Sequence, residues 1–176
     1  IYSEYYAPLD NQAHLYQRRF FNEDGTVAYE EIIDDKEVMY QFPDQIFCSK
    51  EELVGYMVST LNLTEDDVVI IDRSTDIGPA IMKNAAPAKI CSVIHADHFS
   101  EGSTNDDYIL WNNYYEYLFA QHKHIDYYIA STDSQNKLVR KQFQKYLGVT
   151  PNVITIPVGS LKELKYPEDN RKPYSL

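Results

Sequence analysis

The chain has 176 residues, enough for one domain with a sizeable hydrophobic core or for one domain and part of another. Its 16 Lys and Arg residues against 27 Asp and Glu residues give a formal net charge of −11, which argues against sequence-independent binding to nucleic acid or to an anionic membrane surface. The sequence contains no run of about 18 apolar residues, as a membrane span would need, and no leader at its start, so we expect a soluble protein.

An antiparallel β-meander is predicted for the first part of the chain. The turn at residues 22–25 ends in Gly25, which supplies the positive φ angle that a tight hairpin turn needs. Pro43 separates the last two strands, because proline cannot continue a paired strand. The predicted strands are residues 14–21, 26–33, 38–42 and 45–48.

The pattern changes at Ser49, where Ser49 and Glu52 form a capping box that satisfies backbone N–H groups at the start of a helix. From there helices alternate with short apolar strands, typical of strands that are covered on both faces. This alternation predicts right-handed crossovers and a parallel, Rossmann-like α/β sheet, although no glycine-rich phosphate loop follows any strand. The predicted helices are 50–62, 77–84, 106–119 and 133–146, and the predicted strands are 68–72, 89–94, 125–130 and 153–157.

The two cysteines, Cys48 and Cys91, are far apart in the sequence and lack the spacing of metal ligands. Each lies within a predicted strand. We therefore expect both to be reduced thiols in the core of a cytoplasmic protein.

Polar residues follow the predicted parallel strands, at the sheet edge where ligands bind in open α/β folds. The Arg73 guanidinium offers a cationic fork for a carboxylate or phosphate group. The His95 imidazole can donate to a sugar hydroxyl or carry a proton near neutral pH. The strand-end residues are Asp72, Arg73, Ser74, His95, Asp97, His98, Ser131, Thr132 and Gly159.

Other interpretations of these residues stay open. Arg73 could form a structural ion pair with Asp72 or Asp97. His95, Asp97 and His98 could instead ligate zinc or iron, but the sequence assigns no fourth protein ligand, and we expect no metal. None of the nearby serines lies in the glycine-flanked turn of a nucleophilic serine.

The aromatic residues between Trp111 and Phe119 have helical spacing, which favours core packing. One face of this segment, with Asn112, could also border a groove for an acceptor.

Several segments of the chain match a known pattern in combination. They are Phe20–Tyr29, Val69–Thr75, Ile94–Glu101, Ile109–Tyr117 and Thr155–Gly159. Together they resemble the GtfA-type glycosyltransferases of the accessory secretion system of Gram-positive bacteria, which are related to the poly(glycerol-phosphate) α-glucosyltransferases. A glycine would be expected at the turn where this chain has Asp76.

The resemblance implies a retaining, two-lobed GT-B enzyme that transfers N-acetylglucosamine from a UDP-sugar to Ser or Thr of a serine-rich adhesin, with a sister glycosyltransferase subunit as partner. It implies that residues 1–48 end an inserted β-meander domain that binds partner and acceptor, and that residues 49–176 form the Rossmann-like N-terminal lobe, reaching the start of a second lobe. The UDP-binding residues would lie beyond Leu176, so we expect a fragment that is inactive alone. No cofactor is implied, and the complex is expected in the cytoplasm or at the membrane periphery.

Two further functions stay open: a poly(glycerol-phosphate) α-glucosyltransferase that uses UDP-glucose, and a noncatalytic partner subunit of the glycosyltransferase complex. His95 matches the histidine that such enzymes place at the sugar-facing edge, and it is the candidate catalytic residue. Asp97 and His98 are also expected to hold the loop that presents it. The candidate substrate-binding residues are Arg73, Ser74, Asp97, His98, Asn112 and Gly159, and no metal ligand is predicted.

Overall fold

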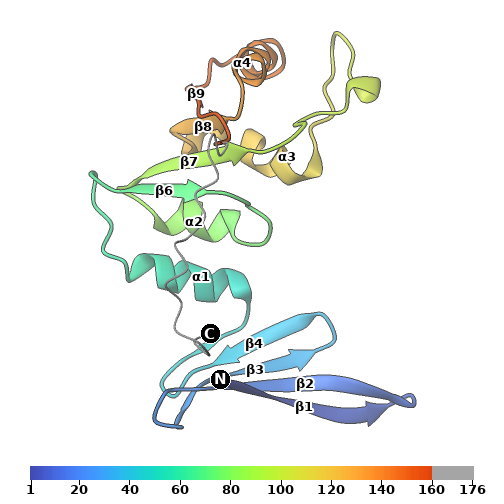
Figure 1. The fold of residues 1–176 in the computed structure, drawn as a ribbon, viewed down its shortest axis with the longest axis vertical. Helices are drawn as coiled ribbons and strands as arrows, with labels where there is room; N and C mark the ends of the chain where they lie inside the picture. The colour runs from blue at the N-terminus through green and yellow to red at the C-terminus, as the bar shows by residue number, and fades with distance from the viewer. Residues whose placement is uncertain (160–176) are drawn as a thin grey trace, which may run out of the picture.

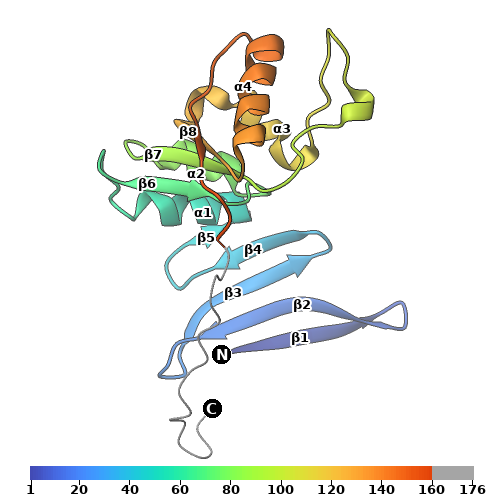
Figure 2. The ribbon, with the colours of Figure 1, turned by 45° about the horizontal axis from the view of Figure 1, so that its top comes forward.

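The computed structural model describes residues 1–159. An antiparallel sheet lies at one end of the molecule and a parallel sheet with its helices at the other, as Figures 1 and 2 show. The last part of the predicted lobe at 49–176, including the predicted start of a second lobe, lies outside the described residues. No helix of the described part is long and apolar enough to cross a bilayer.

The predicted meander is present and has one more strand than predicted. The extra strand, β1, precedes β2 and is joined to it by Asp10 and Asn11, whose φ angles are 51° and 61°. Two consecutive positive φ angles are typical of a two-residue hairpin turn, but this turn lacks the glycine by which the sequence marks such turns. The antiparallel strands are β1 Tyr2–Leu9, β2 Gln12–Phe21, β3 Val27–Asp34, β4 Glu37–Gln41 and β5 Ile46–Phe47. Gly25 has the expected positive φ, 84°, in the turn between β2 and β3.

A row of aromatic rings crosses the antiparallel sheet and reaches the helix that follows it, α1 Lys50–Ser59. Neighbouring ring centroids in this row lie 4.4 to 5.7 Å apart, so the rings pack on one another. The row therefore links the sheet to α1. Its members in order are Tyr2, Phe20, Tyr29, Phe42, Phe47 and Tyr56.

The predicted capping box starts α1. The Ser49 hydroxyl accepts a hydrogen bond from the Glu52 backbone N–H at 3.2 Å, and the Glu52 carboxylate accepts one from the Cys48 N–H at 2.7 Å. Cys48 itself is exposed, because β5 ends one residue before it, so the prediction of a core thiol is wrong at this position. Cys91 is buried in the parallel sheet, as predicted.

The predicted parallel sheet is confirmed, with the strand order β6-β7-β8-β9. Because each crossover moves to the next strand in the same direction, right-handed connections place the intervening helices on one face. Those helices share one apolar core with the sheet. The strands and helices are β6 Val68–Ile71, α2 Gly78–Asn84, β7 Lys89–Ile94, α3 Asn113–Ala120, β8 Tyr127–Ala130, α4 Asp133–Leu147 and β9 Val153–Thr155, with short 3₁₀ turns at Glu101–Ser103 and His122–His124.

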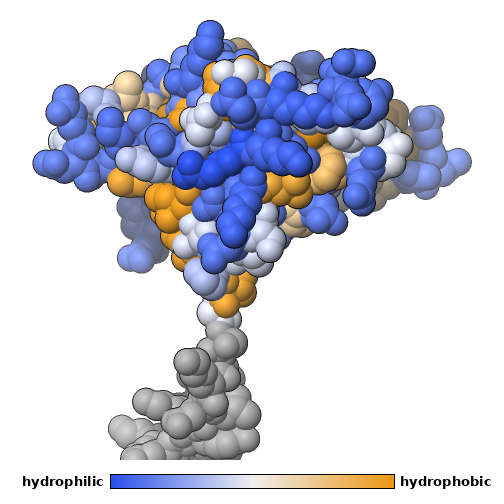
Figure 3. Space-filling view, turned by 90° about the horizontal axis from the view of Figure 1, so that it is seen from above, coloured by the Kyte–Doolittle hydropathy of each residue, from blue (hydrophilic) through white to orange (hydrophobic). Residues whose placement is uncertain are grey.

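The other face of the parallel sheet is only partly covered by described residues. Val68 and Ile70 of β6 are 55% and 59% exposed, and Tyr127 and Ile154 are exposed on other strands, whereas Cys91 of β7 is 7% exposed. Within residues 1–159, the expectation that these strands are covered on both faces is therefore wrong for β6, β8 and β9 but not for β7. Seen from above in Figure 3, hydrophilic side chains cover much of the visible face and hydrophobic ones are exposed in patches between them.

The helix predicted at 106–119 begins seven residues later than predicted. Residues 99–111 form a loop, closed by a bridge between Phe99 and Trp111 and by a hydrogen bond from the Asn112 N–H to the His98 carbonyl. The Asn112 side chain then caps α3 by accepting a hydrogen bond from the Tyr114 N–H. The helical spacing of apolar residues thus extends into a segment that is not helical. Its backbone hydrogen bonds close a loop instead.

Candidate functional site

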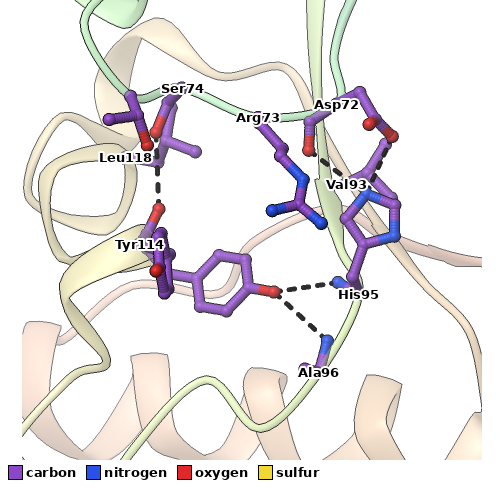
Figure 4. A pocket seen from close by; sticks show the side chains of 10 residues that line it. Asp72, Arg73, Ser74, Val93, His95, Ala96, Tyr114 and Leu118 are labelled. Carbon is purple, nitrogen blue, oxygen red and sulfur yellow. Dashed lines mark hydrogen bonds and ion pairs between the residues drawn. The ribbon is translucent and has the colours of Figure 1, made fainter.

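A pocket of about 240 Å³ lies beyond the carboxyl ends of β6 and β7, at the edge where the sequence predicted a site. Two loops form one side of it, and α3 forms the other (Figure 4). The pocket is therefore built from segments that are far apart in the sequence. Its lining residues are Asp72, Arg73, Ser74, Thr75, Val93, His95, Ala96, Tyr114, Tyr115 and Leu118.

His95 follows the last residue of β7, and its side chain remains 44% exposed. Its Nε2 atom lies 2.7 Å from the Asp72 carboxylate and 3.2 Å from the Asp72 carbonyl oxygen. Since both partners are acceptors, Nε2 carries a proton and donates it, which leaves Nδ1 to face other groups. The arrangement can orient an imidazole so that Nδ1 accepts a hydrogen bond, or donates one when the ring is protonated.

Arg73 is exposed and lines the pocket, and Figure 4 shows its guanidinium pointing into that space. Within residues 1–159 it forms no ion pair with Asp72 or Asp97, and Asp72 pairs with His95 instead. The structural ion pair considered from the sequence is therefore not formed there. A guanidinium that faces a pocket can bind the oxygens of a carboxylate or phosphate group.

Ser74 and Asn112 hold the loops of the site in place. Ser74 is 9% exposed, and its hydroxyl donates to the Tyr114 carbonyl of α3 at 3.3 Å. Asn112 donates from its side chain to the Asp97 carbonyl at 3.2 Å while it caps α3, so it ties the loop after β7 to that helix. Of these two predicted binding residues, the structure places only Ser74 in the pocket lining.

His98 is brought into the core rather than to the pocket. Only 2% of its surface is exposed, its Nε2 donates to the Gln142 side-chain oxygen at 2.6 Å, and its ring packs against Trp111 and Phe119. A side chain so enclosed leaves no surface for a substrate, so His98 is reassigned to the role of holding the loop. It does not line the pocket of about 240 Å³.

Asp97 and Gly159 are exposed, but neither lines this pocket. Among the described residues, no three His, Cys, Asp or Glu side chains lie close enough together to hold a metal ion. Of the two histidines, His95 lines the pocket and His98 is buried in the core.

Sequence reasoning did not find the contacts of two residues of the site. It placed Asp72 at this sheet edge but gave it only the role of a partner for Arg73, and it treated Tyr115 only as part of an aromatic helix face. The Tyr115 hydroxyl accepts hydrogen bonds from the backbone N–H groups of His95 and Ala96 at 3.0 and 3.2 Å. The position of Asp72 directly after a strand was a usable signal, whereas nothing in the sequence links Tyr115 to a loop twenty residues away.

The turn after β6 also explains the glycine expected at residue 76. Asp76 has a φ angle of 64°, in the left-handed region that glycine adopts without steric cost. Asp is among the residues that tolerate this conformation. The backbone of the turn therefore keeps a glycine-like shape although the residue differs.

Burial lowers the pKa of His98, against the opposing effects of its hydrogen bond to Gln142 and of the nearby Asp97 charge. In the unfolded chain this imidazole titrates near its ordinary pKa of about 6.5. Below that pH the unfolded state binds a proton that the folded state does not, so the free energy of unfolding falls as the solution is acidified. Above that pH the imidazole is neutral in both states, and acidification no longer lowers the free energy of unfolding through His98.

We therefore expect urea unfolding of the chain to show a larger loss of stability between pH 7.5 and pH 5.5 than the His98→Gln variant shows, by about 1 kcal/mol. Glutamine keeps an N–H donor near Gln142 but does not titrate. Comparing how the free energy of unfolding changes with pH in the two proteins removes the loss of stability that the substitution itself causes. An equal pH dependence in both would contradict the lowered pKa of His98.

Comparison with known proteins gives a consistent set of relatives. Residues 1–44 match the family described as the GtfA extended beta-sheet domain. The chain is 51% identical over 175 residues to the UDP-N-acetylglucosamine–peptide N-acetylglucosaminyltransferase GtfA subunit of Streptococcus gordonii, and 50% identical over 177 residues to that of Streptococcus agalactiae. These matches cover 99% and 100% of the chain but 35% of each relative. The chain thus spans about a third of the length of these relatives.

Solved structures agree with these matches. A crystal structure of a GtfA/B complex matches with a TM-score of 0.85 and 50% identity, over 98% of this chain and 35% of that one. The pneumococcal O-GlcNAc transferase GtfA in complex with UDP and GlcNAc matches with a TM-score of 0.86 and 46% identity, over 98% of this chain and 34% of that one. TarM of S. aureus, at 19% identity and a TM-score of 0.53 over 89% of this chain and 37% of that one, shares the fold.

Proposed function

We propose that this chain, a homologue of GtfA subunits along its whole length, is part of a retaining glycosyltransferase of the two-lobed GT-B class. The observation that carries the proposal is identity of about 50% across a segment that includes every residue of the pocket. The reaction is transfer of N-acetylglucosamine from a UDP-sugar to Ser or Thr of a serine-rich adhesin. The activity named for these relatives supports the donor and the peptide acceptor.

The residues of the pocket have chemistry suited to one wall of such a site. A nucleotide sugar presents phosphate oxygens and sugar hydroxyls, and Arg73 and His95 are groups that bind these. With Nε2 held by Asp72, the remaining nitrogen of His95 is available to accept from a sugar hydroxyl, or to donate to the departing phosphate when the ring is protonated. Charge that develops on the leaving group is best stabilised by groups that are oriented before the reaction, and Asp72 orients the His95 ring in this way.

The wider assignment rests on the resemblance. A sister glycosyltransferase subunit is the expected partner, supported by the solved complex of GtfA with GtfB. We propose that the enzyme needs no cofactor beyond its UDP-sugar substrate. We also propose that it works in accessory secretion, in the cytoplasm or at the periphery of the cell membrane. Residues 1–48 would contribute to partner and acceptor binding, and residues 49–176 to the N-terminal lobe.

The test is a transfer assay with the full-length protein, produced together with its partner subunit. UDP-N-acetylglucosamine and a serine-rich peptide are the substrates, and mass spectrometry counts the N-acetylhexosamine groups added to serine and threonine. We expect transfer by the full-length protein and none by the 176-residue chain alone, because the expected UDP-binding residues lie outside it. UDP-glucose with a glycerol-phosphate polymer is the competing pair. Transfer to that pair only would overturn the proposed acceptor and donor.

A further inference from the structure

The backbone of residues 95 and 96 is held by side chains from two helices. Both residues follow the end of β7, so they are not part of the sheet. The Tyr115 hydroxyl of α3 accepts hydrogen bonds from both N–H groups, at 3.0 Å from His95 and 3.2 Å from Ala96. The Gln135 side chain of α4 donates to the Ala96 carbonyl at 3.0 Å. Three hydrogen bonds therefore fix two residues that lie between sheet and loop.

The groups that make these bonds are themselves fixed. Tyr115 is 7% exposed, and its ring stacks on Phe119 with the centroids 5.9 Å apart. The Gln135 side-chain oxygen accepts from the Ser131 N–H at 3.0 Å, and its backbone N–H donates to the Thr132 hydroxyl that caps α4. Neither side chain can move without losing packing or another hydrogen bond. The loop is therefore held by the helix core and not only by its own turn geometry.

Fixing the backbone at residue 95 determines the position of the Cα atom from which the His95 side chain extends. Asp72 then fixes the other end of the side chain, through the 2.7 Å contact to Nε2. The position of the ring thus depends on two separate contacts, one to its main chain and one to its ring. In enzymes generally, a shift of about 1 Å in a reacting group can lower a rate by about two orders of magnitude.

We propose that Tyr115, assisted by Gln135, is a positioning residue that holds His95 at the wall of the pocket. The inference rests on the proposed function in one respect only, that His95 acts in sugar transfer. Tyr115 would act through His95 and not on the substrate. The helical spacing of the sequence predicts only that Tyr115 packs in the core, and it does not indicate this role.

The test compares two buried tyrosines that each lose a hydroxyl. Tyr115→Phe removes the acceptor for both N–H groups. Tyr128→Phe is the matched control, because Tyr128 is 1% exposed in the same core and its hydroxyl donates to the Leu118 carbonyl, away from His95. Gln135→Met is a second variant that removes the other contact. All are made in the full-length protein with its partner, labelled with ¹³C at histidine Cε1, and the His95 resonance is assigned by its absence from His95→Gln.

In Tyr115→Phe we expect kcat for transfer from UDP-N-acetylglucosamine to a serine-rich peptide to fall about 10-fold to 100-fold, with the donor KM changed less than about threefold. The His95 resonance should shift or broaden. Gln135→Met should show the same changes to a smaller degree. Tyr128→Phe should lower the melting temperature as much as Tyr115→Phe does, yet leave kcat and the His95 resonance as in the wild type.

Normal kcat in Tyr115→Phe would overturn the proposal. An unchanged His95 resonance would also overturn it, even with lowered kcat, because the loss would then arise elsewhere than at His95. An equal loss of kcat in Tyr128→Phe and Tyr115→Phe would show that general destabilisation lowers the rate. That result would also overturn the proposal. If the wild type transfers no sugar, the proposed function fails, and the resonance alone decides whether Tyr115 positions His95.

Discussion

Replacement of His95 by alanine in the full-length protein is expected to lower kcat for sugar transfer by at least about 100-fold, the range for loss of a group that transfers or shares a proton in the transition state. The imidazole lies at the wall of the pocket, with Nε2 bound to Asp72 and the ring 44% exposed. Alanine removes the one imidazole among the described residues that line the pocket. Initial rates with UDP-N-acetylglucosamine and a serine-rich peptide measure the effect.

The matched control is His124→Ala. His124 is exposed in the 3₁₀ turn before β8 and lines none of the pocket, so its loss should leave kcat within about twofold of the wild type. Melting temperatures of both variants show whether either is destabilised. Unchanged turnover in His95→Ala would remove this residue from the mechanism, and with it the role assigned to Asp72.

Replacement of Phe119 by alanine is expected to cost about 3 to 5 kcal/mol of folding free energy, the usual range for deleting a buried aromatic side chain. Phe119 has no exposed surface and contacts a ring on each of five other residues. The cavity left behind is surrounded by large side chains that cannot collapse into it without leaving their own contacts. The five ring partners are His98, Trp111, Tyr115, Tyr128 and Phe143.

Urea unfolding of the 176-residue chain measures this cost. Tyr114→Ala serves as control on the same helix, because Tyr114 is 65% exposed and its removal should cost less than about 1 kcal/mol. Phe119→Leu should fall between the two, since leucine fills part of the space. If Phe119→Ala cost no more than Tyr114→Ala, the aromatic cluster would not be the centre of this core.

Much of the fold could be predicted because the deciding signals are local. The capping box at Ser49, the positive φ at Gly25 and the apolar runs of the parallel strands each reflect the chemistry of neighbouring residues. The predictions failed where a distant partner decided the outcome. α3 starts late because Phe99 and Trp111 pair across a loop.

The candidate site divides in the same way. Parallel topology alone brings Arg73 and His95 to one sheet edge, so these two residues were found from the sequence. The sequence offered His98 both as a binding residue and as a residue that holds the loop. It could not decide between the two roles, because nothing near His98 in the chain shows that Gln142 and Phe119 enclose it. The same holds for Tyr115, whose hydroxyl meets the loop only once α3 packs on the sheet.

The sequence by itself determined the alternation of strands and helices, and from it the edge of the sheet at which a site lies, because periodicity and capping act within a few residues. Only the tertiary structure decided which polar side chains face the pocket and which are enclosed. That choice depends on hydrogen bonds between groups 20 to 44 positions apart in the chain, such as Tyr115 to His95 and His98 to Gln142. Such partners come together only when the helices pack on the sheet, so no pattern among neighbouring residues predicts them.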